Sequence, residues 1–168
     1  MYKNIKSFTK IAEFGRKLLS RPSLELAIPI ISSYAKDLLE ADRCSVFIYN
    51  HEKNCLWTVL ADGVGALEIS ADEGIAGASF QEAKALIVND PYCDIRFSSK
   101  TDHKTGYITK NIISIPIMDA FNKPIGVLQL LNKTKGDFDQ EDKRLLTFFN
   151  HYISGYVELA NHFNEEDN

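Results

Sequence analysis

The sequence predicts an α+β domain: a central antiparallel sheet of about five or six strands, with the N- and C-terminal helices on one face and short helices and a lid loop on the other. Three observations favour this fold class. The chain has 168 residues, 45% of them hydrophobic and 25% charged, which is ordinary for one globular domain. Apolar residues recur at helical spacing near both ends. Runs rich in β-branched and aromatic residues, joined by short polar turns, indicate antiparallel strands between them.

Two helices are expected at the N-terminus and one at the C-terminus. Residues 3–20 show helical apolar spacing, and Arg21-Pro22 interrupts it because proline disfavours α geometry in the residue before it. Ser23 is the expected N-cap of the second helix, which should run to about residue 40. The last helix should begin at the N-capping side chain of Asp139 and continue to about residue 162.

The middle of the chain is predicted to hold the strands and one short helix. Two strand-like runs flank a four-residue polar connection and predict a hairpin. The expected strands lie at residues 43–50, 55–61, 67–70, 85–88, 112–118 and 124–131, and the short helix at residues 74–83.

Residues 89–104 show no apolar periodicity and hold a proline, two aromatic residues and many polar side chains. So long a stretch without regular structure in a compact domain is usually a lid or a binding loop. We expect one helical turn at residues 105–109 to follow, so that Thr105 and Thr109 share a face and both hydrogen-bond one ligand. We call residues 89–110 the lid, and expect it to cover a small-molecule cavity against the sheet.

Composition argues against several partners. The net charge of −4 is unlike the basic stripe of a nucleic-acid binder. No apolar run approaches the roughly 18 residues of a membrane span, and no signal-like segment opens the sequence. Three widely spaced cysteines, Cys44, Cys55 and Cys93, suit a reducing cytoplasm better than a disulfide framework or a metal site. We therefore expect a cytoplasmic domain with no nucleic-acid or membrane partner, no metal and no cofactor.

The two ends of the chain carry opposite charge. Residues 1–23 hold six basic and one acidic side chain, whereas residues 139–168 hold seven acidic and two basic ones. The ends are either solvated helix faces or pack together, within or between chains. Apolar side chains that we expect to be exposed on these helices predict a homodimer built as a helical bundle. They are Phe8, Ile11, Phe148 and Tyr152.

Four segments carry a resemblance to a known family. They are Arg43-Cys44-Ser45-Val46-Phe47, Glu73-Gly74-Ile75-Ala76-Gly77, Asp90-Pro91-Tyr92 through Arg96-Phe97 with Thr105-Gly106-Tyr107, and Asn132-Lys133 followed by Phe138 and Asp142. Over about residues 23–160 the chain resembles a GAF domain, of the kind found in cyclic-nucleotide phosphodiesterases and bacterial adenylate cyclases. The resemblance implies a linker helix at residues 1–22, a GAF domain at 23–162 and an acidic tail at 163–168.

The resemblance also implies a ligand-binding set. An anion such as a cyclic phosphate would meet the backbone N–H groups at a helix start, and Phe97 would stack on a base. Gln129 stands where some relatives have an acid, so it could read a base without a predictable purine preference. The implied set is Ser45, Ile75, Ala76, Phe97, Asp102, Thr105, Thr109 and Gln129. Purely structural roles are equally open: holding the lid together for the threonines, a tight turn for Gly74 and Gly77, and a hydrophobic plug for Phe97.

The fourth segment is expected to be structural. In the family its lysine and aspartate pair with each other, which implies that Lys133 and Asp142 fix the loop before the last helix, together with Asn132 and Phe138. Lys143 departs from the family pattern, which has glutamate there.

These features predict a non-enzymatic sensory module for signal transduction. It would bind a small ligand, with cAMP or cGMP as the expected one, and relay occupancy through its terminal helices to a signalling output protein. The alternative is a ligand-free module for dimerisation or protein interaction. Catalysis has little support, because Ser79 lacks the second glycine of a nucleophile elbow. The cysteines also do not match the set with which some GAF domains reduce free methionine sulfoxide.

Overall fold

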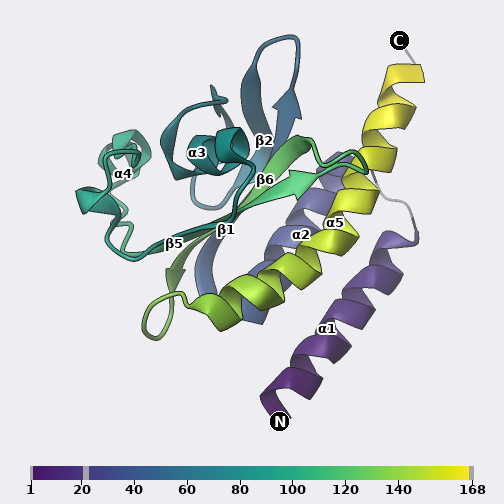
Figure 1. Ribbon diagram of the computed structural model, residues 1–168, viewed down its shortest axis with the longest axis horizontal. Coiled ribbons are helices and arrows are strands. Elements are labelled where there is room, and N and C mark those ends of the chain that lie inside the picture. Colours follow the sequence, from purple (N-terminus) through teal and green to yellow (C-terminus); the bar gives the residue numbers. More distant parts are fainter. Residues whose placement is uncertain (1, 21–22, 167–168) are drawn as a thin grey trace.

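A six-stranded antiparallel sheet forms the middle layer of the computed structural model, which describes residues 2–20 and 23–166 (Figure 1). The strand order is β3-β2-β1-β6-β5-β4. The strands are β1 (Ala41–Asn50), β2 (Cys55–Ala61), β3 (Gly65–Ser70), β4 (Leu86–Val88), β5 (Ile112–Met118) and β6 (Pro124–Lys133). The helices are α1 (Tyr2–Leu18), α2 (Leu24–Leu39), α3 (Gly74–Glu82), α4 (Lys100–Thr105) and α5 (Gln140–Glu166), with a 3-10 turn η1 (Pro91–Cys93). The predicted fold class is confirmed.

Both faces of the central strands are buried, because successive side chains point to opposite faces and each face has its own cover. On β1, Cys44 and Val46 pack with the terminal helices. Phe47, the residue after Val46, belongs to a separate cluster on the other side of the sheet, with Ala76 of α3 and Val127 of β6. The strands therefore separate a helical core from the layer that contains α3 and the lid.

The helical layer consists of α2 and α5 against the sheet, with α1 alongside them (Figure 1). Phe14 of α1 is fully buried, and its ring centroid lies 4.5 Å from that of Phe149. Ile11 is only 1% exposed, so the expectation that it belongs to an exposed stripe is wrong. It lies three residues before Phe14 and therefore on the same inward face of α1. The oppositely charged ends of the chain thus pack together.

The expected helix boundaries are mostly reproduced. Ser23 occupies the N-cap of α2, but its side chain makes no capping hydrogen bond. Asp139 caps α5, since its Oδ1 accepts the N–H groups of Glu141 and Asp142 at 2.8 and 2.9 Å. The predicted break at Arg21-Pro22 lies outside the described residues. Of the predicted acidic tail, residues 163–166 are helical and 167–168 lie outside the described residues.

The lid is more regular than predicted. It contains η1 and α4, and α4 ends at Thr105. Gly106 follows with a φ of 72°, a left-handed conformation that commonly terminates helices. The helical turn expected at residues 105–109 is therefore wrong: the helix ends at Thr105 and does not continue beyond Gly106.

Candidate functional site

A cavity of about 100 Å³ lies between the sheet, α3 and the lid. Every residue of the predicted ligand-binding set except Thr105 lines it: Ser45, Ile75, Ala76, Phe97, Asp102, Thr109 and Gln129. The fold thus brings together residues that are more than 80 positions apart in the sequence, from the sheet, α3 and the lid.

Ser45 and Gln129 on the floor of the cavity belong to a polar row that continues across three strands to the buried Ser114. Ser45 on β1 is paired in register with Gln129 on β6, which is paired with Ser114 on β5. The Ser114 hydroxyl donates to Gln129 Oε1 at 2.8 Å. This bond fixes the amide, so that the Nε2 donors of Gln129 point away from Ser114.

The start of α3 forms one wall. Gly74 has a φ of 69°, and a Cβ on Gly77 would lie 2.4 Å from the backbone carbon of Asp72, so both positions need glycine for the turn into the helix. The first intrahelical bond runs from the Gly77 N–H to the Glu73 carbonyl. The N–H groups of Ile75 and Ala76 therefore have no partner within the helix.

Glu73 ties this wall to the lid. Its Oε1 accepts the Ser98 hydroxyl and pairs with Lys100 Nζ, both at 3.0 Å. Sequence reasoning did not single out this glutamate as a cavity residue, although it directly precedes Gly74. Its carboxylate therefore joins the start of α3 to the residues at the start of α4.

Asp102 organises the interior of the lid. It is 8% exposed, and its Oδ1 accepts the Thr109 hydroxyl at 2.9 Å. Its Oδ2 accepts the Thr109 N–H at 2.8 Å and the Tyr92 hydroxyl at 2.6 Å. The hydrogen bond to Asp102 raises the pKa of Tyr92. Thr109 therefore holds the lid together while also lining the cavity.

Thr105 lies outside the cavity. It is exposed, and its hydroxyl donates to the Thr101 carbonyl at 2.8 Å. Because α4 ends here at the left-handed C-cap Gly106, Thr105 and Thr109 do not share a helix face. Gly106 is the sequence signal that would have placed the helix end correctly.

Arg43 and Tyr107 also line the cavity and were missing from the predicted set. The Arg43 guanidinium lies over the Tyr107 ring, 3.5 Å from its centroid. Arg43 could have been found from its position two residues before Ser45, since alternate residues of a strand share a face. Phe97 lies in the wall with its ring centroid 5.1 Å from that of Tyr92, edge to face.

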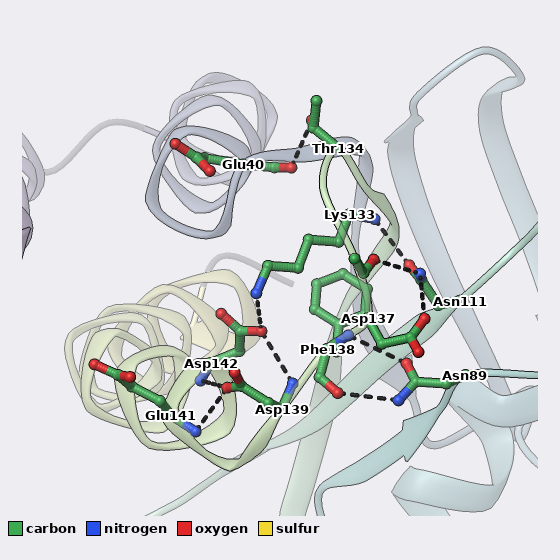
Figure 2. A network of polar contacts seen from close by, with 11 residues as sticks. Glu40, Asn89, Asn111, Lys133, Thr134, Asp137, Phe138, Asp139, Glu141 and Asp142 are labelled. Carbon is green, nitrogen blue, oxygen red and sulfur yellow. Dashed lines mark hydrogen bonds and ion pairs between the residues drawn. The ribbon is translucent and has the colours of Figure 1, made fainter.

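The predicted structural segment takes part in a network of polar contacts that joins Asn89, the first residue of the lid, to the start of α5 (Figure 2). Lys133 forms an ion pair with Asp142, as the family resemblance implied. Asn111 Oδ1 accepts the Lys133 N–H at 2.8 Å, and Asn111 Nδ2 donates to the Gly136 carbonyl at 3.2 Å. Asn132 Oδ1 accepts the Lys110 N–H at 2.6 Å, so the end of the lid is joined to the end of β6.

The cysteines lie in different environments. Cys44 and Cys55 are buried and Cys93 is exposed. Burial raises the pKa of the Cys44 thiol to about 12, so it stays protonated and unreactive at neutral pH. Within residues 2–20 and 23–166, no group of three or more His, Cys, Asp or Glu side chains is placed to hold a metal ion. Over the same residues no helix has the length and apolarity to span a membrane.

Known proteins share this sequence pattern and fold. The chain is 28% identical over 141 residues to "Probable 3',5'-cyclic phosphodiesterase pde-5" of Caenorhabditis elegans, covering 76% of the chain and 19% of that protein. It is 36% identical over 135 residues to the cGMP-specific 3',5'-cyclic phosphodiesterase of Drosophila pseudoobscura pseudoobscura, covering 66% of the chain and 12% of that protein. The chain therefore spans less than a fifth of either relative.

Solved structures show the same fold at lower identity. The GAF domain of a phosphoenolpyruvate-protein phosphotransferase from Coxiella burnetii superposes with a TM-score of 0.84 at 16% identity, covering 96% of this chain and 98% of that one. The sequence model of the GAF domain family matches residues 23–156. With the family pattern and the layered fold both present, this chain belongs to the GAF domain family of regulatory modules.

Proposed function

We propose that this GAF domain is a sensory module for signal transduction that binds a small ligand of the cyclic-nucleotide class in the cavity and relays its occupancy to α5. The observation that carries the proposal is that polar groups from three parts of the fold line one cavity. They are the amide of Gln129 and the hydroxyl of Ser45 on the floor, the N–H groups at the start of α3, and the polar side chains of the lid. The relatives named as cyclic-nucleotide phosphodiesterases support this ligand class.

Each part of the cavity suits a different part of such a ligand. The N–H groups of Ile75 and Ala76 and the dipole of α3 favour a phosphate. Gln129, held by Ser114, offers its Nε2 donors to a base edge. Phe97 supplies an aromatic face in the wall. A bound nucleotide would therefore contact the sheet, α3 and the lid together.

The fastening of the lid supports a relay. Its first residue, Asn89, is bonded to Phe138, and its last residues are bonded to Asn132. Asn132 is near the end of β6, and Phe138 lies in the connection between β6 and α5. A ligand that changes the position of the lid would therefore bias the start of α5, which is a population shift between two arrangements. The domain needs no catalytic group for this role, and an output protein would read α5.

Thermal unfolding with cAMP, cGMP and cyclic di-GMP tests the proposal directly. A ligand at 100 times its dissociation constant should add about 2.7 kcal/mol to the free energy of unfolding, which raises Tm by several degrees. Gln129→Leu should weaken binding by roughly tenfold, the value of one lost hydrogen bond. Gln140→Leu, the same change at an exposed position, should leave binding unchanged. No rise in Tm at saturating concentration of any of the three would refute the proposal.

A homodimer is the second proposal, and a specific surface favours it. Phe8, Phe148 and Tyr152 are 53%, 43% and 42% exposed. Their rings touch edge to face, with centroids 5.7 Å apart for Phe8–Phe148 and 5.9 Å for Phe148–Tyr152. We call these three residues the aromatic patch. Such a contiguous aromatic surface across two helices is typical of protein–protein contacts. Dimerisation through it is compatible with ligand binding, and equally with a module that binds none.

A further inference from the structure

Tyr107 stands where the lid meets the edge of the cavity, and it rests on Arg43. The guanidinium lies 3.5 Å from the Tyr107 ring centroid. On its other side is Gly63, where a Cβ would lie 2.5 Å from Arg43 Cζ. The guanidinium is thus stacked between the Tyr107 ring of the lid and the backbone of Gly63 in the β2–β3 turn. Gly63 has a φ of 79°, so a larger residue is excluded there on two grounds.

Few contacts hold Tyr107 in this place. Its hydroxyl donates to Asp42 Oδ2 at 2.8 Å, and its N–H donates to Thr105 Oγ1 at 3.3 Å. Its neighbours Gly106 and Ile108 are exposed. Burial, followed by the bond to Asp42, raises the pKa of Tyr107, so its hydroxyl remains a donor to that carboxylate at neutral pH. By contrast, Asp102 and Thr109 are buried and joined by two hydrogen bonds.

The cavity in this arrangement is too small for the proposed ligand. Its volume is about 100 Å³, whereas pockets that hold small molecules measure roughly 300–1,000 Å³. Some lining group must therefore move before a nucleotide enters. Tyr107 is the aromatic lining residue that lies between two exposed neighbours and beside Gly106, whose left-handed backbone makes it a natural hinge.

We propose that Tyr107 is a gate, closed in this structure by its stacking on Arg43 and its bond to Asp42, and that its displacement admits the ligand. The inference rests on the proposed small-ligand function for its purpose. The arrangement of the gate itself rests on contacts within the chain. In the closed state the guanidinium lies against the ring, and in the open state it is uncovered toward the cavity that it lines. The gate therefore sets the rate of ligand entry through the fraction of molecules that are open.

The experiment compares Tyr107→Ala and Tyr107→Phe with Ile108→Ala, an exposed neighbour, in the full chain. Association of a fluorescent N-methylanthraniloyl derivative of cGMP, followed by stopped flow, should be roughly tenfold faster in Tyr107→Ala because the open fraction rises. Tyr107→Phe, which loses only the bond to Asp42, should lie between that variant and the wild type. Ile108→Ala should match the wild type. Equal rates in all four proteins would overturn the gate while leaving the proposed ligand function standing.

A second measurement reads the gate without a ligand. Hydrogen–deuterium exchange at the start of α3 reports access to the N–H groups of Ile75 and Ala76, which lack helical partners. Exchange there should speed up in Tyr107→Ala and not in Ile108→Ala. Unchanged exchange in Tyr107→Ala overturns the gate even if no cyclic nucleotide binds the wild type. Faster exchange without any nucleotide binding supports the gate and refutes the proposed ligand class.

Discussion

Asn89 and Phe138 exchange two hydrogen bonds, although 49 residues separate them in the chain (Figure 2). The Asn89 Oδ1 accepts the Phe138 N–H at 3.2 Å, and its Nδ2 donates to the Phe138 carbonyl at 3.0 Å. The side-chain amide thus acts as a neighbouring strand would, satisfying both backbone groups of one residue. Because Asn89 is the first residue of the lid and Phe138 lies just before α5, this pair links the cover of the cavity to the start of the last helix.

Replacing Asn89 with alanine should therefore lower stability. Asn89→Ala leaves a carbonyl and an N–H of Phe138 without partners in a partly buried place, which should lower the free energy of unfolding by about 1–3 kcal/mol. Asn50→Ala is the matched control, since it removes one exposed hydrogen bond in the β1–β2 turn and should cost less. Urea denaturation of both variants measures the difference. Equal losses would contradict the role of Asn89 as a fastening.

The sequence was a good guide to this architecture and a partial guide to the cavity. Helical spacing placed the helices, because each helix buries one face, and short polar turns between apolar runs placed the strands. Arg43 and Tyr107 escaped prediction because their contact joins β1 to the lid across more than 60 residues. Thr105 was misplaced for a local reason: the four-residue spacing to Thr109 suggested a helix, while Gly106 between them terminates one. The burial of Ile11 depends on how α1 packs, which periodicity alone does not decide.

The two threonines of the lid give a matched pair of substitutions. Thr109→Val keeps the shape of a buried side chain and removes its bond to the Asp102 carboxylate, so the free energy of unfolding should fall by about 1.5–3 kcal/mol. Thr105→Val removes two hydrogen bonds, to the Thr101 carbonyl and from the Tyr107 N–H, and should cost less than about 1 kcal/mol because both are exposed to water. Thermal or urea denaturation distinguishes them. If Thr105→Val were the more damaging change, the assignment of Thr109 to the interior of the lid would be wrong.

The buried thiol of Cys44 should make stability fall in alkaline solution. Burial raises its folded-state pKa to about 12, whereas an unfolded cysteine titrates near pH 8.5. Between these values the unfolded chain binds fewer protons than the folded chain, so stability is fully present below about pH 8.5 and falls as pH rises, by at most about 1.4 kcal/mol per unit. Cys44→Ala lacks this dependence. The stability advantage of the wild type over Cys44→Ala should therefore shrink between pH 8 and pH 10.

Val46→Ala provides the reference for that measurement. Val46 is a buried residue of the same strand that does not titrate, so its cost should be the same at both pH values. Urea denaturation at pH 8 and pH 10 gives both differences. A cost for Cys44→Ala that is equally constant would show that the thiol is not protected from ionisation in the folded protein.

The aromatic patch predicts how the domain associates. At tens of micromolar the wild type should sediment as a dimer, because edge-to-face rings exposed on α1 and α5 gain from burial against a second copy. Phe148→Glu places a charge in the middle of the patch and should give a monomer with little change in folding, since this side chain is 43% exposed. Leu26→Glu, on the exposed face of α2, should remain a dimer. A monomeric wild type would contradict the prediction. If Phe148→Glu remained a dimer, the interface would have to lie outside the aromatic patch, because burying an unpaired carboxylate there would cost too much free energy.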